Sequence, residues 1–153
     1  MRKTIILFFA TGTFLGYSPL APGTIGTLWG IPMAYGISVL GPGRGIFAVV
    51  LTVFASILFA GMAKGIIGGR DPGSIVCDEV AGFVVAAFMV PFTPLNMILA
   101  FILFRIFDIL KPFPIGILDR RIKGGAGIVL DDVAAGIYAN ICVHIITGVV
   151  SWV

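Results

Sequence analysis

The feature that most constrains the fold is a run of 22 residues, 46–67, in which Lys64 is the only charged side chain. A transmembrane α-helix needs about 20 consecutive apolar residues, so this run predicts a helix that spans a bilayer. Shorter apolar stretches predict further helices over residues 25–40, 78–90, 95–110 and 133–153. Charged residues make up 11% of the chain, against about 25% in soluble domains. The expected fold is all-α: a polytopic integral membrane helical bundle of about four to five membrane helices, in a single domain over residues 1–153.

Four other segments predict shorter or looser structure. Residues 1–17 have a basic start and an apolar run too short for a comfortable span, which favours an interfacial or re-entrant helix, although a span over 4–17 stays open. Residues 115–123 mix apolar and charged side chains and predict an amphipathic helix at the headgroup level. The glycines of 41–45 predict a tight turn, and those of 124–127 predict a flexible connection.

A heptapeptide with an acidic pair occurs twice. Residues 75–81 read IVCDEVA, and residues 128–134, 53 positions later, read IVLDDVA. Each pair precedes an apolar run, so both are expected on the first turn of a helix, where unpaired N–H groups favour carboxylates. All seven acidic residues lie between positions 71 and 132, and the alternative is that they are ordinary loop charges. The pairs predict one divalent-metal site, formed by Asp78, Glu79, Asp131 and Asp132. Gly82 and Gly136, one turn past the pairs, predict close helix packing.

Cations suited to phosphate accompany the acidic pairs. Arg105 and Asp108 lie one helical step apart and therefore on one face. Lys111, Arg120, Arg121 and Lys123 follow in the connecting segments. Carboxylates suit Mg²⁺, which commonly bridges to substrate phosphate, and Arg and Lys bind the remaining phosphate oxygens. Together these residues predict phosphoryl transfer, which depends on charge neutralisation and on placement of a nucleophile.

The Gly- and Pro-rich stretch 16–27 offers a further anion contact. Thr24 is expected to cap a helix that starts near Ile25, and Gly23 beside it leaves backbone N–H groups accessible to phosphate. The alternative for this stretch is a plain loop.

The positive charges predict the orientation in the membrane. Threading the predicted spans alternately leaves only Arg44 on one side. The other nine cations share the opposite side: Arg2, Lys3, Lys64, Arg70, Arg105, Lys111, Arg120, Arg121 and Lys123. Because cytoplasmic loops carry the excess of Lys and Arg, the crowded side is cytoplasmic, and every carboxylate lies there. The net charge of +3 is too small and dispersed to indicate a nucleic-acid partner.

Four blocks of sequence resemble the phosphatidylglycerophosphatase A family of bacteria. They read PLAPGTIGT (19–27), DPGSIVCDEVAGF (71–83), FRIFDILKPFPI (104–115) and LDRRIKGGAGIVLDDVAAG (118–136). The resemblance implies a multi-pass enzyme of the bacterial cytoplasmic (inner) membrane, with its active site facing the cytoplasm. It also implies a Mg²⁺-dependent lipid phosphatase that converts phosphatidylglycerophosphate to phosphatidylglycerol and phosphate.

The family motifs and the charges together assign roles to individual residues. Asp78, Asp131 and Asp108 are the catalytic candidates, and Asp78, Glu79, Asp131 and Asp132 are the metal ligands. The phosphate-binding candidates are Arg105, Lys111, Arg120, Lys123, Thr24 and Gly23. Metal-activated water is the simplest nucleophile, and attack by an aspartate stays open.

Two other functions fit parts of the pattern. Intramembrane acids and a repeated unit also suit a small ion-coupled transporter or channel subunit, but the acids cluster at one face instead of the midplane. A phosphatidyltransferase that uses a CDP-linked alcohol is disfavoured, because its spaced DG…AR…G…D…D pattern is absent from the sequence.

Overall fold

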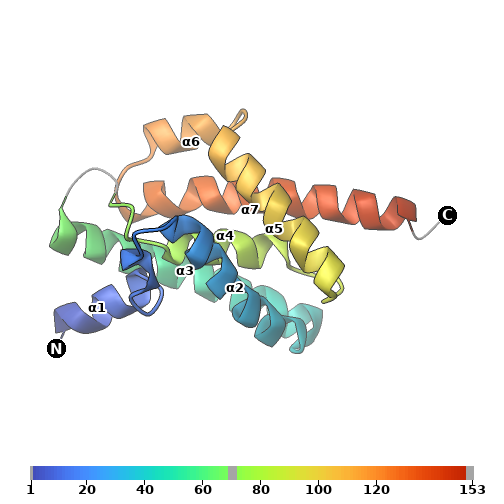
Figure 1. Ribbon diagram of the computed structural model, residues 1–153, viewed down its shortest axis with the longest axis horizontal. Coiled ribbons are helices and arrows are strands. Elements are labelled where there is room, and N and C mark those ends of the chain that lie inside the picture. Colours follow the sequence, from blue (N-terminus) through green and yellow to red (C-terminus); the bar gives the residue numbers. More distant parts are fainter. Residues whose placement is uncertain (1, 69–71, 151–153) are drawn as a thin grey trace.

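The computed structural model describes residues 2–68 and 72–150, and this part of the chain consists of helices joined by turns and loops, without strands. The elements are α1 (Arg2–Ala10), the 3-10 helix η1 (Leu15–Tyr17), α2 (Pro22–Ser38), α3 (Gly41–Ile67), α4 (Cys77–Ala86), α5 (Pro94–Leu110), α6 (Ile115–Arg121) and α7 (Gly124–Val150), as Figure 1 shows. The all-α prediction is confirmed.

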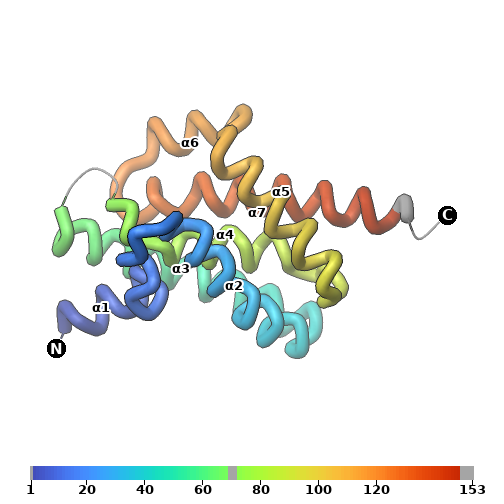
Figure 2. The backbone as a smooth tube through the Cα atoms, in the orientation of Figure 1, coloured from blue at the N-terminus to red at the C-terminus, as the bar shows by residue number. Residues whose placement is uncertain are grey.

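The short helix α4 forms the centre of the bundle. It packs against α2, α3, α5 and α7, and Figure 2 traces it between them. Eight of its ten residues are buried, and Phe83 contributes to a core that includes Phe104 and Val143. The segment before α4 is also enclosed: Val76 is fully buried, and its N–H donates to the Ala10 carbonyl at 2.9 Å. This pairing satisfies a backbone group that burial would otherwise leave without a partner.

Among the described residues, two helices are long and apolar enough to cross a membrane: α3, and α7 from Gly124 to Gly148. The helices α2 and α5 have 17 residues each, which corresponds to about 25 Å at a rise of about 1.5 Å per residue. The ten residues of α4 and the nine of α1 are too short to cross a hydrocarbon core of about 30 Å. The prediction of a membrane-type helix after the first acidic pair is therefore wrong for α4, which ends at Ala86.

Prolines shift the starts of two helices relative to the prediction. The helix α2 starts at Pro22, and its N-cap residue Ala21 makes no side-chain capping bond. Thr24 therefore lies within the first turn and is not the predicted cap. The helix α3 starts at Gly41, so residues 41–45 form its first turn instead of a loop. Both differences have one cause: proline suits the first helical turn, where its missing N–H costs no hydrogen bond.

The start of α7 also differs from the prediction. Residues 124–127 are helical, so the second acidic pair lies about two turns inside a helix and not on its first turn. Gly125 explains this arrangement. A Cβ atom there would overlap the Ile57 carbonyl and lie 2.6 Å from the Gly61 nitrogen. The missing side chain lets α7 run directly against α3, and this contact stabilises helix in a segment whose composition favours a loop.

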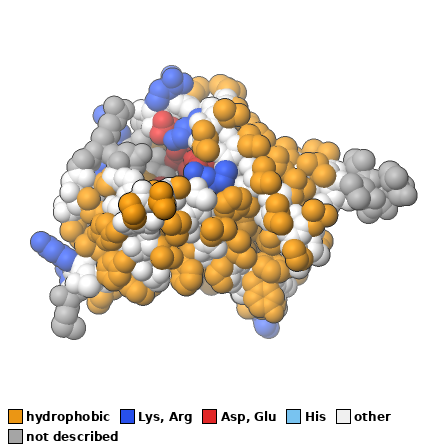
Figure 3. All heavy atoms as spheres, viewed as in Figure 1, with side chains coloured by type: hydrophobic (Ala, Val, Ile, Leu, Met, Phe, Trp, Pro, Cys, Tyr) orange, Lys and Arg blue, Asp and Glu red, His pale blue; other side chains and the backbone are white. Residues whose placement is uncertain are grey.

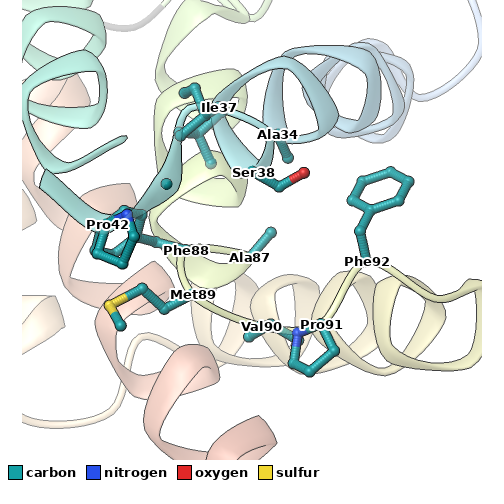
Figure 4. Close-up of a pocket in the computed structure, with 12 residues that line it drawn as sticks. Ala34, Ile37, Ser38, Pro42, Ala87, Phe88, Met89, Val90, Pro91 and Phe92 are labelled. Carbon is teal, nitrogen blue, oxygen red and sulfur yellow. The ribbon is translucent and has the colours of Figure 1, made fainter. Parts of the chain in front are cut away.

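An apolar pocket of about 360 Å³ marks the far end of the bundle, where α2 ends, α3 begins and α4 turns toward α5. Figure 4 shows its lining of hydrophobic side chains, with the Ser38 hydroxyl as a polar exception. None of the described residues that line it is ionisable. The charged chemistry of the molecule lies at the opposite end.

Candidate active site

A cavity of about 990 Å³ opens at the end of the bundle where α3 and α5 finish and α4 and α7 begin. Figure 3 shows acidic and basic side chains gathered in this hollow, with hydrophobic side chains around them. Its ionisable lining residues are Lys64, Asp78, Glu79, Asp108, Lys111, Asp119, Arg120, Lys123, Asp131 and Asp132. Six carboxyl groups and four cations therefore share one space.

Three of the carboxylates form a compact cluster. Asp78 and Glu79 lie on the first turn of α4 and Asp132 lies on α7, with one oxygen of each within 4.8 Å of the others. Two glycines bring these helices together: a Cβ at Gly82 would lie 2.8 Å from the Asp132 carbonyl, and a Cβ at Gly136 would overlap the Gly82 carbonyl. The predicted close packing at these glycines is confirmed.

The cluster has the properties of a cation site. Asp78 is 9% exposed and Asp132 is 4% exposed. Among the described residues, no group donates a hydrogen bond to Asp78 Oδ1 or Glu79 Oε2, although both atoms are buried. Burial and the neighbouring Glu79 charge raise the pKa of Asp78, and burial also raises the pKa of Glu79. Buried carboxylates without partners are costly, so this donor set fits a hard divalent cation, which would neutralise the charge and accept the free oxygens as ligands.

Asp131 takes a different partner from its neighbour Asp132. Its Oδ2 accepts a hydrogen bond from Lys111 Nζ at 2.6 Å, and its Oδ1 is buried without a partner among the described residues. Successive residues of a helix point about 100° apart, so the two aspartates face different parts of the cavity. The structure thus brings together three of the four predicted metal ligands and pairs the fourth with a cation.

Lys111, which follows the last residue of α5, hydrogen-bonds to two carboxylates. It also donates to Asp119 Oδ1 at 3.0 Å. Burial alone would lower the pKa of Lys111, but the hydrogen bonds to Asp131 and Asp119 outweigh it and raise the pKa above its ordinary value. Lys111 therefore remains a cation in the cavity at neutral pH.

Arg105 and the start of α2 lie beside the carboxylate cluster. Arg105 Nη1 donates to Asp108 Oδ2 at 2.7 Å. A Cβ at Gly23 would lie 3.3 Å from Arg105 Nη1 and would overlap Glu79 Oε1, so Gly23 lies directly against both side chains. Thr24 is half-buried in the adjoining turn. Gly23 therefore adjoins the charged site, and its contact with phosphate stays a prediction.

The remaining predicted cations lie on or after α6. Arg120 and Lys123 are exposed and line the cavity, and Arg120 Nε donates to the Gly116 carbonyl at 2.8 Å. The sequence reasoning gave no site role to Lys64 or Asp119, which line the same cavity. The sequence contained a signal for each: Asp119 belongs to the same motif as Arg120, and Lys64 is one of the nine cations predicted on the same side of the membrane as the carboxylates.

The fold and the cavity define a class: an all-α protein whose described residues include two helices suited to cross a membrane and a carboxylate cluster that could hold a metal ion, in a cavity also lined by basic side chains. The profile of the phosphatidylglycerophosphatase A family matches residues 8–147, and the chain belongs to this family. Phosphatidylglycerophosphatases are phosphoric monoester hydrolases of phospholipid biosynthesis, so the resemblance seen in the sequence is confirmed.

Three relatives match most of the chain. The phosphatidylglycerophosphatase A of Escherichia coli is 36% identical over 129 residues, which cover 84% of this chain and 75% of the relative. That of Haemophilus influenzae is 38% identical over 143 residues, which cover 92% of this chain and 88% of the relative. A Bacteroides thetaiotaomicron protein, named provisionally as a phosphatidylinositol-3-phosphatase, is 36% identical over 147 residues, covering 91% of each chain. No solved structure shows a significant match.

Proposed function

We propose that this chain hydrolyses the terminal phosphate monoester of phosphatidylglycerophosphate to give phosphatidylglycerol and inorganic phosphate, with Mg²⁺ as cofactor. The observation that carries the proposal is the cluster of Asp78, Glu79 and Asp132, which has buried oxygens without partners and lies in a cavity lined by cations. Membership of the phosphatidylglycerophosphatase A family supplies the substrate class.

Asp78, Glu79 and Asp132 are the residues that would hold the ion. Their hard oxygen donors match the preference of Mg²⁺. When bound, Mg²⁺ supplies neutralisation of the phosphate charge and activation of water.

The cations bind and orient the phosphate. Lys111 is held in the cavity by Asp131 and Asp119, and it presents a fixed positive charge to a phosphate oxygen. Arg120 and Lys123 are exposed at the cavity wall, and the Lys123 ammonium and the Nη atoms of Arg120 bind the remaining oxygens. Arg105 stands with Asp108 next to Gly23, at the start of α2, where backbone N–H groups favour an anion.

Asp131 is the best candidate to position the attacking water. Its Oδ2 is held by Lys111, so its free Oδ1 has a fixed direction. As the bond between the water oxygen and phosphorus forms, Oδ1 accepts one proton. The bond between phosphorus and the glycerol oxygen breaks, and that proton is then available to the departing oxygen. The catalytic role predicted for Asp131 is thus retained, while its predicted role as a metal ligand loses support.

We further propose that α2, α3, α5 and α7 are the membrane helices of one domain, with α4 enclosed among them and α1 and α6 at the interface. The lengths of α2 and α5 support this count, since a tilted or locally thinned bilayer accommodates about 25 Å. The basic residues of α6 support a cytoplasmic location for the cavity in a bacterial inner membrane.

A second lipid is a candidate substrate because of the Bacteroides relative and its name. Phosphatidylinositol 3-phosphate also carries a phosphate monoester on a polar headgroup. The same residues would perform the same reaction on it, so a direct comparison of the two lipids is needed.

The test is phosphate release by the purified protein in detergent micelles, from phosphatidylglycerophosphate and from phosphatidylinositol 3-phosphate. We expect release from the first lipid with Mg²⁺, none with a chelator, and a loss of at least about 100-fold for Asp132→Asn, the scale of losing an electrostatic contact to the transition state. Arg121→Gln removes an exposed charge outside the cavity and serves as control. Folded protein that releases no phosphate from this lipid under any condition would contradict the proposal. Faster release from the inositol lipid would reassign the substrate.

A further inference from the structure

Lys64 lines the same cavity as the carboxylate cluster but belongs to a different helix from the other cations. It lies in the last turn of α3 and is half-buried. Within the described parts of the chain, its ammonium group forms no ion pair or hydrogen bond, whereas Arg105 is paired with Asp108 and Lys111 with Asp131. An unpaired ammonium that faces a cavity is available to an anionic ligand.

The packing of α3 against α7 fixes where Lys64 lies along the cavity. The two helices are antiparallel and touch where Gly61 meets Gly125: a Cβ at Gly61 would lie 3.5 Å from the Gly125 Cα. With a helical rise of about 1.5 Å per residue, Asp132 lies about 10 Å deeper than Gly125, and Lys64 lies about 4 Å further out than Gly61. Lys64 therefore occupies the outer end of the cavity, and the carboxylate cluster occupies the inner end.

Two separated sites of charge match a ligand with two phosphate groups. Both lipids considered above contain a phosphodiester, which joins the headgroup to diacylglycerol, and a monoester further along the headgroup. The monoester belongs at the carboxylate cluster, where the metal would bind. The end of an apolar helix long enough to span marks the headgroup level of the bilayer, which is where the phosphodiester of a lipid lies.

We propose that Lys64 binds the phosphodiester of the substrate and so favours lipids with two phosphates over lipids with a monoester alone. This inference rests on the proposed phosphatase function, because it requires the monoester at the inner end. Lys64 is a substrate-binding residue that acts on affinity, and the chemical step proceeds at the carboxylate cluster without it.

The experiment compares Lys64→Gln with the unmodified protein in mixed micelles with Mg²⁺. We expect KM for phosphatidylglycerophosphate to rise about tenfold or more, the scale of one hydrogen bond to a charged group, while kcat stays within about twofold. Phosphatidate, which has only a monoester, is added as a competitor, and its inhibition constant should be the same in both proteins. Lys64→Arg, which keeps the charge, should restore most of the affinity.

The matched control is Lys3→Gln, which removes an exposed lysine of α1 that does not line the cavity. It should leave KM unchanged, which separates a specific contact from general attraction of an anionic lipid surface. The inference is overturned by an unchanged KM in Lys64→Gln, by a loss confined to kcat, or by an equal loss of phosphatidate binding. Failure of the proposed function has a different signature: the unmodified protein itself would release no phosphate from phosphatidylglycerophosphate.

Discussion

Asp78, Glu79 and Asp132 repel one another in the metal-free protein, because their oxygens lie within 4.8 Å of each other in a buried setting. Arg105 and Lys111 do not neutralise this cluster, because each is already paired with another carboxylate: Arg105 with Asp108 and Lys111 with Asp131. Like charges that share a buried site destabilise the folded state unless a proton or a metal ion neutralises them. The site therefore couples metal binding to stability, and this coupling can be measured without any substrate.

The variant Asp132→Asn should separate the charge repulsion within the cluster from the stabilisation by bound metal. The amide removes one of the repelling charges, so the variant should unfold at a higher temperature than the unmodified protein in the presence of a chelator. At a Mg²⁺ concentration about 100 times Kd, bound metal should stabilise the unmodified protein by about 2.7 kcal/mol. For a chain of this size that corresponds to about 5–10 °C, and the variant should lose most of this gain. The measurement is thermal unfolding in detergent with and without Mg²⁺.

Asp119→Asn is the matched control for that variant, since Asp119 lines the same cavity but lies outside the three-carboxylate cluster. It should keep the Mg²⁺-dependent gain in stability. If Asp132→Asn keeps the full gain as well, the cluster is not where the metal binds.

At the scale of helices, the sequence predicts the existence of most elements but not the setting of the second acidic pair. The repeat at 75–81 and 128–134 suggests two equivalent helix starts, yet only the first begins a helix. Gly124 to Gly127 read as a loop because glycine is a poor helix former in isolation. Their helical state depends on contact with α3, a tertiary interaction that no local pattern contains.

For the site as well, the sequence predicts which residues take part but not how they are paired in space. Charge pattern and motifs identify the carboxylates and most of the cations, because those residues stand together in short segments. The pairing of Asp131 with Lys111 depends on how α5 ends relative to α7. The presence of Lys64 in the cavity depends on the register of α3 along α7. Both depend on the packing of helices that are far apart in the sequence, which no local pattern specifies.

Gly125→Ala tests the contact on which this register depends. The added methyl would meet the Ile57 carbonyl and the Gly61 backbone, so α7 must move away from α3. Overpacking of this kind costs about 1–3 kcal/mol of stability. The shift also moves Asp132, so phosphate release should fall along with the unfolding temperature.

Gly65→Ala provides the comparison within α3, since a Cβ at Gly65 meets no atom within 4 Å. Alanine is favoured over glycine in a helix by about 0.8–1.0 kcal/mol, so this variant should be at least as stable as the unmodified protein. Equal stability of Gly125→Ala and Gly65→Ala would show that the α3–α7 contact is not as close as the structure indicates.

The whole molecule separates charge from apolar surface along its length. The cavity and its ionisable groups occupy one end, and the pocket at the other end has an apolar lining. The flank of α3 between these ends exposes large apolar side chains, with Phe47 70%, Phe54 57% and Leu51 56% exposed. Contiguous apolar surface of this kind is unfavourable in water and is expected where lipid surrounds the protein. The molecule thus has the charge distribution expected of a protein that crosses a bilayer with its cavity open at one interface.

The proposed orientation in the membrane can be tested at two positions at opposite ends of the bundle. Arg44 lies in the first turn of α3, and Arg121 lies at the end of α6, on the side of the cavity. Cysteines introduced at 44 and 121, in a background with Cys142→Ala, can be labelled with a membrane-impermeant reagent in right-side-out and inverted vesicles. Native Cys77 is only 6% exposed and should not react. Position 121 should label only in inverted vesicles and position 44 only in right-side-out ones, since the positive-inside rule assigns the basic end to the cytoplasm. Labelling of both positions from one side would contradict the assignment of α3 as a membrane span, because α3 carries the chain from the level of Arg44 to the level of the cavity.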